Sequence, residues 1–228
     1  MSSPSPPRIL IIGAGSRGNA YAKAIKHSTN GIVAAVAEPI AFKRQELGEK
    51  HIWSGRQPEP HEEFTSWRNF IRYEEQRRQR EAAGETFEEG VDGVFICVLD
   101  EQHAEVITAL APLNLHIMSE KPLATTLGDC LRIYRSLVQK DTEKVPERTF
   151  SICHVLRYSP HNMLLRKLLL EKEVIGDVLS IEHTEPVGWW HFSHSYVRCV
   201  GELSSENSVR ESYKAQSGGS EEVAATRA

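Results

Sequence analysis

An α/β fold with a doubly wound parallel sheet is predicted by three observations. Short apolar runs, beginning with 8–12 and 32–37, alternate along the chain with segments of helical composition. Each run is nearly continuous in hydrophobicity, as expected of strands buried on both faces. Because parallel strands need crossover connections, the alternation predicts helices on both faces of one sheet.

The predicted elements follow in order from residue 8 to about residue 157. A helix at 16–27 joins the first two strands, and the Asn30-Gly31 turn precedes the second strand. The segment after residue 40 is less regular until apolar residues return at helical spacing from Phe64 to Ile71. Further strands are predicted at 93–99, 115–119 and 150–156, with helices at 102–110 and from Thr126 onwards, where Leu127, Leu131, Tyr134 and Val138 share one face.

A shorter second domain is predicted to follow the first. A helix from Pro160 to about Lys172 ends at Gly176, and 178–185 looks like the start of a β-rich region. The last 28 residues contain no Phe, Trp or Ile, so they cannot bury enough apolar area to offset their ordering entropy. We therefore expect a disordered N-terminus at 1–7, the sheet domain at 8–157, an incomplete α+β domain at 158–200 and a disordered tail at 201–228.

Composition excludes several classes of protein. The formal net charge is −4, and the basic cluster around Arg77 alternates with glutamates, which predicts a solvated helix face rather than a nucleic-acid surface. The four cysteines are scattered without a C-x-x-C pair, so reduced thiols are expected. The first seven residues lack a secretory signal and no later stretch approaches membrane-spanning length, which predicts a cytoplasmic protein without a membrane partner.

The strongest functional signal is a G-x-G-x-x-G motif between the first strand and the first helix. Such a loop permits a tight turn, a close backbone approach to a diphosphate and close packing of helix on strand. The helix N-terminus then offers unpaired N–H groups to the phosphates. The motif predicts a dinucleotide-binding Rossmann domain whose cofactor-binding loop consists of Gly13, Ala14, Gly15, Ser16, Arg17 and Gly18.

Glu38 is the predicted acceptor for the adenosine ribose. It stands at the end of the second strand, 20 residues after Gly18, where a carboxylate can accept both ribose hydroxyls. A carboxylate there would repel a 2'-phosphate, so NAD is expected over NADP. Lys43 and Arg44 lie nearby and could soften this discrimination.

The segment Ser119-Glu120-Lys121-Pro122-Leu123, directly after the fifth predicted strand, carries a family resemblance. Together with the glycine loop, Glu38 and the segment 99–105, it resembles the Gfo/Idh/MocA oxidoreductases, the family of glucose-fructose oxidoreductase and inositol dehydrogenase. The resemblance covers about residues 8–198. It implies an NAD(P)-dependent dehydrogenase that transfers hydride between the nicotinamide and a sugar, polyol or related secondary alcohol.

The resemblance also implies roles for individual residues. Lys121 would be the catalytic residue, reaching the substrate hydroxyl, and a cis peptide bond before Pro122 would aim it. Arg157 and Tyr158 would join Lys121 in binding substrate, with a hinge contact as the alternative for the segment that begins at His154. The cofactor contacts implied beyond the loop and Glu38 are those of Asp100, His103, Glu120, Lys121 and Pro122.

The chain also departs from the family pattern. Members carry an Asp and a His a few residues apart in the second domain, whereas no aspartate occurs here after Asp177. We therefore hypothesise a truncated member, so that a non-catalytic dinucleotide-binding fragment or regulator is an open alternative to the dehydrogenase. Homo-oligomers would be expected only with a complete second domain.

A metal site is not expected. His191 and His194 form an H-x-x-H pattern, but in an extended segment residues three apart point to opposite faces.

Overall fold

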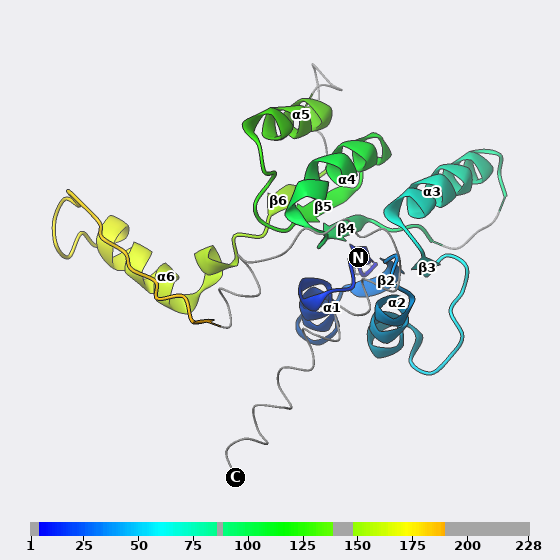
Figure 1. The fold of residues 1–228 in the computed structure, drawn as a ribbon, viewed down its shortest axis with the longest axis horizontal. Coiled ribbons are helices and arrows are strands. Elements are labelled where there is room, and N and C mark those ends of the chain that lie inside the picture. Colours follow the sequence, from blue (N-terminus) through cyan, green and yellow to red (C-terminus); the bar gives the residue numbers. More distant parts are fainter. Residues whose placement is uncertain (1–4, 86–88, 139–147, 190–228) are drawn as a thin grey trace, which may run out of the picture. The chain divides into compact units, whose positions relative to one another are not determined.

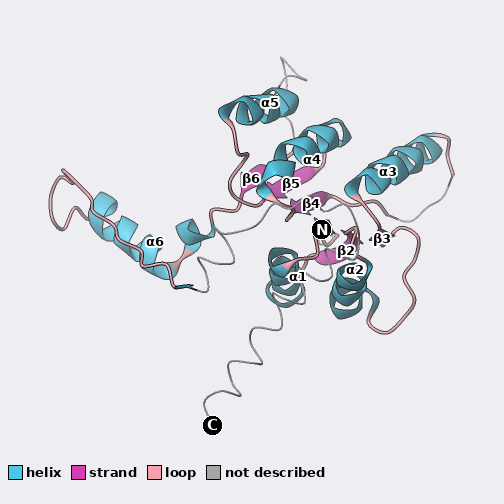
Figure 2. Ribbon diagram, viewed as in Figure 1, coloured by secondary structure: helices cyan, strands magenta, loops and turns pink. Residues whose placement is uncertain are grey.

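The computed structural model describes residues 5–85, 89–138 and 148–189. Its described part contains one six-stranded sheet in the order β3-β2-β1-β4-β5-β6, and every neighbouring pair is parallel (Figure 2). The strands are β1 (Arg8–Ile12), β2 (Ile32–Ala37), β3 (Glu63–Phe64), β4 (Gly93–Ile96), β5 (His116–Ser119) and β6 (Phe150–Ile152). The parallel sheet predicted from the buried apolar runs is confirmed.

Helices cover both faces of this sheet. The longer ones are α1 (Ser16–Ser28), α2 (Ala41–Gly48), α3 (Trp67–Ala82), α4 (His103–Leu110) and α5 (Leu127–Val138). Helices α1 and α2 lie on one face, and α3, α4 and α5 lie on the other (Figure 1). Each face has its own buried apolar cluster, one around Ile11 and Val36 and the other around Leu10 and Ile96. Alternate residues of β1 thus point into opposite layers, which is the doubly wound arrangement.

The strand order reverses at β1, and this reversal locates the crevice of the fold. The first connection runs from β1 to β2 on one side, whereas β4 pairs with β1 on the other side. The crossovers on either side of this point lie on opposite faces, so a crevice opens at the carboxyl ends of β1 and β4. Gly13, Glu38 and Cys97 directly follow β1, β2 and β4 at this edge.

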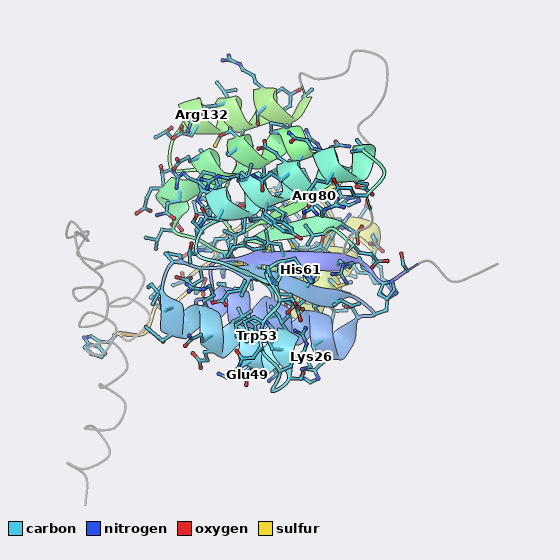
Figure 3. The ribbon with its side chains drawn as sticks, turned by 90° about the vertical axis from the view of Figure 1, so that its right-hand side faces the viewer. Lys26, Glu49, Trp53, His61, Arg80 and Arg132 are labelled. Carbon is cyan, nitrogen blue, oxygen red and sulfur yellow. The ribbon has the colours of Figure 1, made fainter. Side chains whose placement is uncertain are left out.

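The irregular segment after residue 40 folds into structure that the sequence pattern did not predict. Helix α2 continues into a wider helical turn, η1 (Glu49–Trp53), which brings the Trp53 ring against Gly48. A Cβ on Gly48 would overlap that ring, and Trp53 is buried. Figure 3 places Trp53 with Lys26 and Glu49 in the layer of α1 and α2, opposite Arg80 and Arg132.

The charged half of α3 is not a uniformly solvated face, and that expectation is wrong for Glu74. Its side chain is 1% exposed. Arg77 donates two hydrogen bonds to it, at 2.8 and 2.9 Å, and Arg78 donates a third at 2.7 Å. The charges of the cluster are therefore largely satisfied within the helix itself.

Helix α5 buries a different face from the apolar stripe noted in its sequence. Leu127, Leu131, Tyr134 and Val138 are all exposed, whereas Ile133 is 1% exposed and packs into the core.

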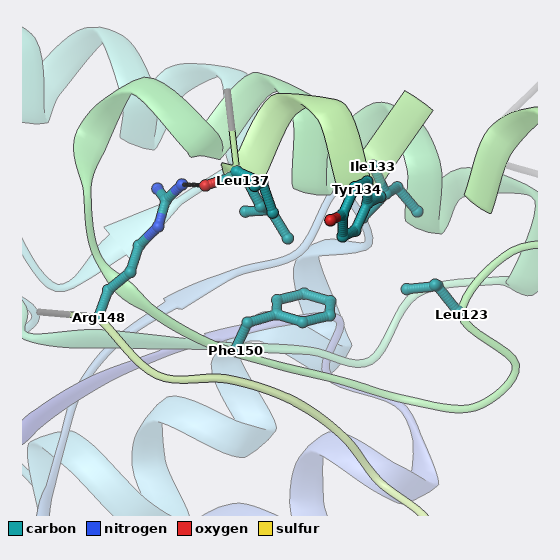
Figure 4. Close-up of a pocket in the computed structure, with 7 residues that line it drawn as sticks. Leu123, Ile133, Tyr134, Leu137, Arg148 and Phe150 are labelled. Carbon is teal, nitrogen blue, oxygen red and sulfur yellow. Dashed lines mark hydrogen bonds between the residues drawn. The ribbon is translucent and has the colours of Figure 1, made fainter. Parts of the chain in front are cut away.

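Arg148 donates to the carbonyl oxygens of Ala111 and Leu137, both at 2.7 Å. Between α5 and β6 lies an apolar pocket of about 210 Å³, lined by Leu123, Ile133, Tyr134, Leu137, Val138, Arg148 and Phe150 (Figure 4).

The described residues fall into two units, the first ending at Met163 and the second beginning at Leu164. Beyond β6 the described helical segments are η4 (Val155–Tyr158), α6 (Pro160–Arg166) and η5 (Lys167–Glu171); the remaining short ones are η2 (Asp100–Gln102) and η3 (Ala111–Leu113). The strand expected at 178–185 does not form, because within 164–189 no neighbouring strand pairs with it. The helical segment ends at Glu171 and not at Gly176, which has φ of +73° in a separate turn where its amide donates to the Glu173 carbonyl. The predicted tail at 201–228 lies outside the described residues.

In the described ranges, no helix combines the length and the apolar character needed to cross a membrane.

Candidate functional site

The glycine loop forms the centre of the candidate site. Gly13 has φ of +95°, and a Cβ there would lie 2.6 Å from the Cys97 carbonyl oxygen, while a Cβ on Gly18 would overlap the Gly13 carbonyl. Only glycine fits these two positions. Gly15 differs, because nothing lies within 4 Å of the place its Cβ would take. Gly15 is also the N-cap of α1. It has no side chain that could accept hydrogen bonds from the first amides of the helix.

Glu38 is held rigidly beside this loop. Its Oε2 accepts a hydrogen bond from the Ala14 amide at 2.8 Å, and its Oε1 accepts one from the Ile40 amide at 3.0 Å. Its own backbone amide donates to the Phe64 carbonyl at 3.0 Å. A carboxylate has about four acceptor sites, so these two bonds leave capacity for further donors. The acidic side chain and the loop are thus one connected unit.

The two nearby cations are placed differently. Arg44 is buried; its Nε lies 2.6 Å from Glu63 Oε1, and its Nη1 donates to the Glu38 carbonyl at 2.6 Å. Lys43 is half-buried, and this burial lowers its pKa, although the negative charge of Glu38 opposes the shift. The guanidinium of Arg44 is therefore directed toward β3 and the backbone beneath Glu38.

The other half of the site lies along the carboxyl ends of β4, β5 and β6. The register pairs Ile96 with Ser119 and Ser119 with Ile152, so the next residues, Cys97, Glu120 and Cys153, form a row across three strands. Glu120 is buried. Tyr21 of α1 donates a hydrogen bond to its Oε1, the Lys121 amide donates to Oε2 at 3.1 Å, and Arg17 forms an ion pair with it at 3.9 Å.

His103 holds the opposite side of the Lys121-Pro122 segment. It is 0% exposed, with Nδ1 lying 2.7 Å from the Pro122 carbonyl oxygen and Nε2 3.3 Å from that of Val98. The Lys121-Pro122 peptide bond is cis, as the family resemblance implied. Glu120 from one side and His103 from the other therefore fix this segment at the edge of the sheet.

The remaining predicted site residues are more loosely placed. Asp100 begins η2 and is exposed, as are Ser16, Lys121 and Pro122. Arg157 and Tyr158 lie on η4 after β6, and both are exposed. Within the described ranges, neither of these two takes part in the hydrogen bonds around Glu120 and His103.

Tyr21, Cys97 and Cys153 belong to this edge but were not predicted. Burial and the neighbouring Cys153 and Glu120 hold the pKa of Tyr21 well above its usual range, so its hydroxyl remains a donor at neutral pH. Burial likewise raises the pKa of both thiols. One signal was present in the sequence: Tyr21 follows Arg17 by four residues, so the two share a helix face.

No group of three or more His, Cys, Asp or Glu side chains is arranged to hold a metal ion in the described part of the chain. His191 and His194 lie outside it.

A parallel sheet whose order reverses at β1, a glycine loop at the start of α1 and an acidic side chain after β2 define a dinucleotide-binding Rossmann domain. Residues 7–145 match the Gfo/Idh/MocA family, described as an oxidoreductase family with an NAD-binding Rossmann fold. The chain belongs to this family.

Several relatives are dehydrogenases or catabolic proteins. The chain is 29% identical over 120 residues to the rhizopine catabolism protein MocA of Rhizobium meliloti, covering 52% of this chain and 30% of that protein. It is 22% identical over 165 residues to inositol 2-dehydrogenase of Salmonella typhimurium, covering 72% of this chain and 41% of the relative.

Solved structures share the fold. Scyllo-inositol dehydrogenase from Lactobacillus casei, crystallised with NAD(H) and scyllo-inositol, superposes with a TM-score of 0.59 at 17% identity, over 75% of this chain and 43% of that one. The chain thus spans well under half the length of these relatives.

Proposed function

We propose that this chain binds NAD(H) in the crevice at the carboxyl edge of its sheet. Gly13 and Ala14 would shape the loop, and the amides of Gly15 and of the first turn of α1, including Ser16 and Gly18, would hold the diphosphate, with Arg17 beside it. Glu38 would accept the adenosine ribose hydroxyls. The open space at Gly15 supports this fit, since a Cβ would occupy the place where the phosphates approach.

The observation that carries the proposal is the hydrogen bond from the Ala14 amide to Glu38 Oε2. It joins the loop that would hold the diphosphate to the carboxylate that would hold the ribose. The two groups therefore need no rearrangement to act together, and preorganisation of this kind lowers the cost of binding. Burial of Glu38 beside the loop also supports a preference for NAD over NADP.

The proposed reaction is oxidation or reduction of a secondary alcohol, with a sugar or polyol as the substrate class. When bound, the nicotinamide supplies the hydride acceptor or donor. Lys121 would orient the substrate hydroxyl and move its proton, while Asp100, His103, Glu120 and Pro122 would line the cofactor beside it. Arg157 and Tyr158 would contact the substrate. The inositol dehydrogenases among the relatives support this substrate class.

A second candidate is cofactor binding without efficient turnover. No aspartate follows Asp177 within the 228 residues, which favours this candidate for these residues by themselves, because they do not contain the Asp and His pair that the family resemblance implies. For the 228 residues by themselves we expect measurable NADH binding with weak or absent turnover of polyols.

The cofactor site is tested by titrating NADH into the chain by calorimetry. Gly15→Trp should abolish binding, because its ring would fill the open space at the loop. Gly128→Trp is the matched control, since Gly128 lies on α5 with only Thr126 near its Cβ, and it should bind like the parent. A Gly15→Trp variant that holds NADH as tightly as the parent contradicts the proposal.

Turnover is tested separately by following nicotinamide absorbance with myo-inositol and related polyols. Robust turnover that Lys121→Ala abolishes would favour the dehydrogenase and reject the second candidate.

A further inference from the structure

The Arg44–Glu63 ion pair stands directly behind the proposed ribose acceptor. Arg44 lies in the first turns of α2, six residues after Glu38, and Glu63 begins β3. The Arg44 Nε is 2.6 Å from Glu63 Oε1, and Nη1 is 2.6 Å from the Glu38 carbonyl and 3.4 Å from that of Pro39. The arginine side chain is 11% exposed and the glutamate side chain 26%.

An arginine close to the end of β2 is the group that can neutralise a 2'-phosphate in dinucleotide-binding folds. In this chain the guanidinium is held instead by a carboxylate and by backbone carbonyls. Charge-assisted hydrogen bonds of this length are among the stronger polar contacts, so a phosphate would have to displace them before Arg44 could turn outward. The carboxylate of Glu38, fixed by Ala14 and Ile40, meanwhile occupies the ribose side.

We infer that the Arg44–Glu63 pair makes the site selective for NAD(H) by withholding Arg44 from the 2'-phosphate of NADP(H). This inference rests on the proposed cofactor function. Glu38 repels the 2'-phosphate, and Glu63 removes the nearby arginine that could compensate for that repulsion. Glu63 is therefore a specificity-determining residue that acts through Arg44 without touching the cofactor.

The test compares the dissociation constants of NADPH and NADH for the full chain, by calorimetry with each cofactor. Glu63→Gln keeps the size of the side chain but removes the charge that holds Arg44. We expect the ratio of the NADPH constant to the NADH constant to fall about tenfold, the value of one gained charged contact to phosphate. The ratio is the readout because a general loss of structure weakens both cofactors alike.

Two double variants identify the responsible cation. Glu63→Gln with Arg44→Met should restore the ratio of the parent, whereas Glu63→Gln with Lys43→Met should keep most of the tenfold gain. Glu46→Gln is the control for lost charge: it removes a glutamate of α2 that pairs with Lys50 of η1, and it should leave the ratio unchanged.

An unchanged ratio in Glu63→Gln, or a gain that persists without Arg44, overturns the inference while NADH binding by the parent still supports the proposed function. A parent chain that binds neither cofactor contradicts the proposed function itself. If Glu63→Gln unfolds, Glu63→Asp gives the second measurement: its shorter side chain loosens the pair, and a ratio that does not fall would also overturn the inference.

Discussion

Glu120 makes polar contacts at the carboxyl edge of the sheet with Tyr21, Arg17 and the Lys121 amide. It takes a hydrogen bond from a helix on one face, through Tyr21, and another from the amide of the residue that follows it. A buried carboxylate needs such donors, because leaving it unsatisfied costs its full desolvation. Tyr21 thus links the helix that carries the glycine loop to the segment that carries Lys121.

Tyr21→Phe should lower the free energy of unfolding by about 2 kcal/mol, the typical value of a hydrogen bond to a charged group. Urea denaturation followed by circular dichroism measures this change. Tyr134→Phe is the control, because that side chain is exposed on α5 and should change stability very little. Equal effects from both variants would show that the bond to Glu120 contributes nothing particular.

Glu74 makes the free energy of unfolding depend on pH. Burial alone would raise its pKa, but hydrogen bonds and charges from Arg77 and Arg78 outweigh this, and the net shift is below the ordinary value of 4.5. A carboxyl whose pKa is lower in the folded chain contributes stability fully above its unfolded pKa. That contribution is lost as the pH falls through the folded value.

Glu74→Gln should therefore cost about 3 kcal/mol at pH 7, since it leaves two arginines without their buried partner. The gap between parent and variant should shrink as the pH falls below 4.5. Urea denaturation at pH 7, 5 and 3.5 would measure it, and a gap that stays constant over this range contradicts the assignment.

At the scale of elements, α5 shows that an apolar stripe and a core-facing side need not coincide. The exposed stripe and the buried Ile133 lie on different faces of the same helix. Ile133 belongs to the buried core, whereas the stripe is exposed, although Tyr134 and Val138 also line the pocket beside β6.

Ile133→Ala should lower the free energy of unfolding by about 2 to 5 kcal/mol, the range for a large apolar side chain removed from a core. Leu131→Ala, two residues earlier on the exposed face, should cost about 0.5 kcal/mol or less. Chemical denaturation of both variants separates the faces, and a larger loss for Leu131→Ala would mean that the stripe is covered in solution.

Most of the strands could be predicted because a buried parallel strand leaves a continuous apolar run, as β1, β2 and β4 do. Strand β3 could not, because its two residues are too short to leave a pattern. Helix α2 could not be predicted either, because it has few buried positions and one of them is charged. These positions include Arg44 and Leu47. Burial of an arginine depends on a partner 19 residues away, which no local pattern reveals.

At the scale of the whole molecule, the glycine loop could be predicted because its requirements are local. Gly13 has a positive φ of +95°, and a Cβ on Gly18 would overlap the Gly13 carbonyl only five residues earlier, so both requirements are local. The contacts of Tyr21 with Glu120 and of His103 with Pro122 join residues 99 and 19 positions apart, so they follow from the assembled sheet and not from spacing. Sequence patterns thus predict the candidate site but not the hydrogen bonds that hold it together.

The row of Cys97, Glu120 and Cys153 has a consequence for the chemistry of sulfur in this protein. The two cysteines stand two strands apart, roughly 10 Å, which is beyond the reach of a disulfide bridge. Burial also keeps both thiols protonated, and the protonated form attacks peroxides and alkylating reagents poorly. Both thiols should therefore react slowly with oxidants and alkylating reagents at neutral pH.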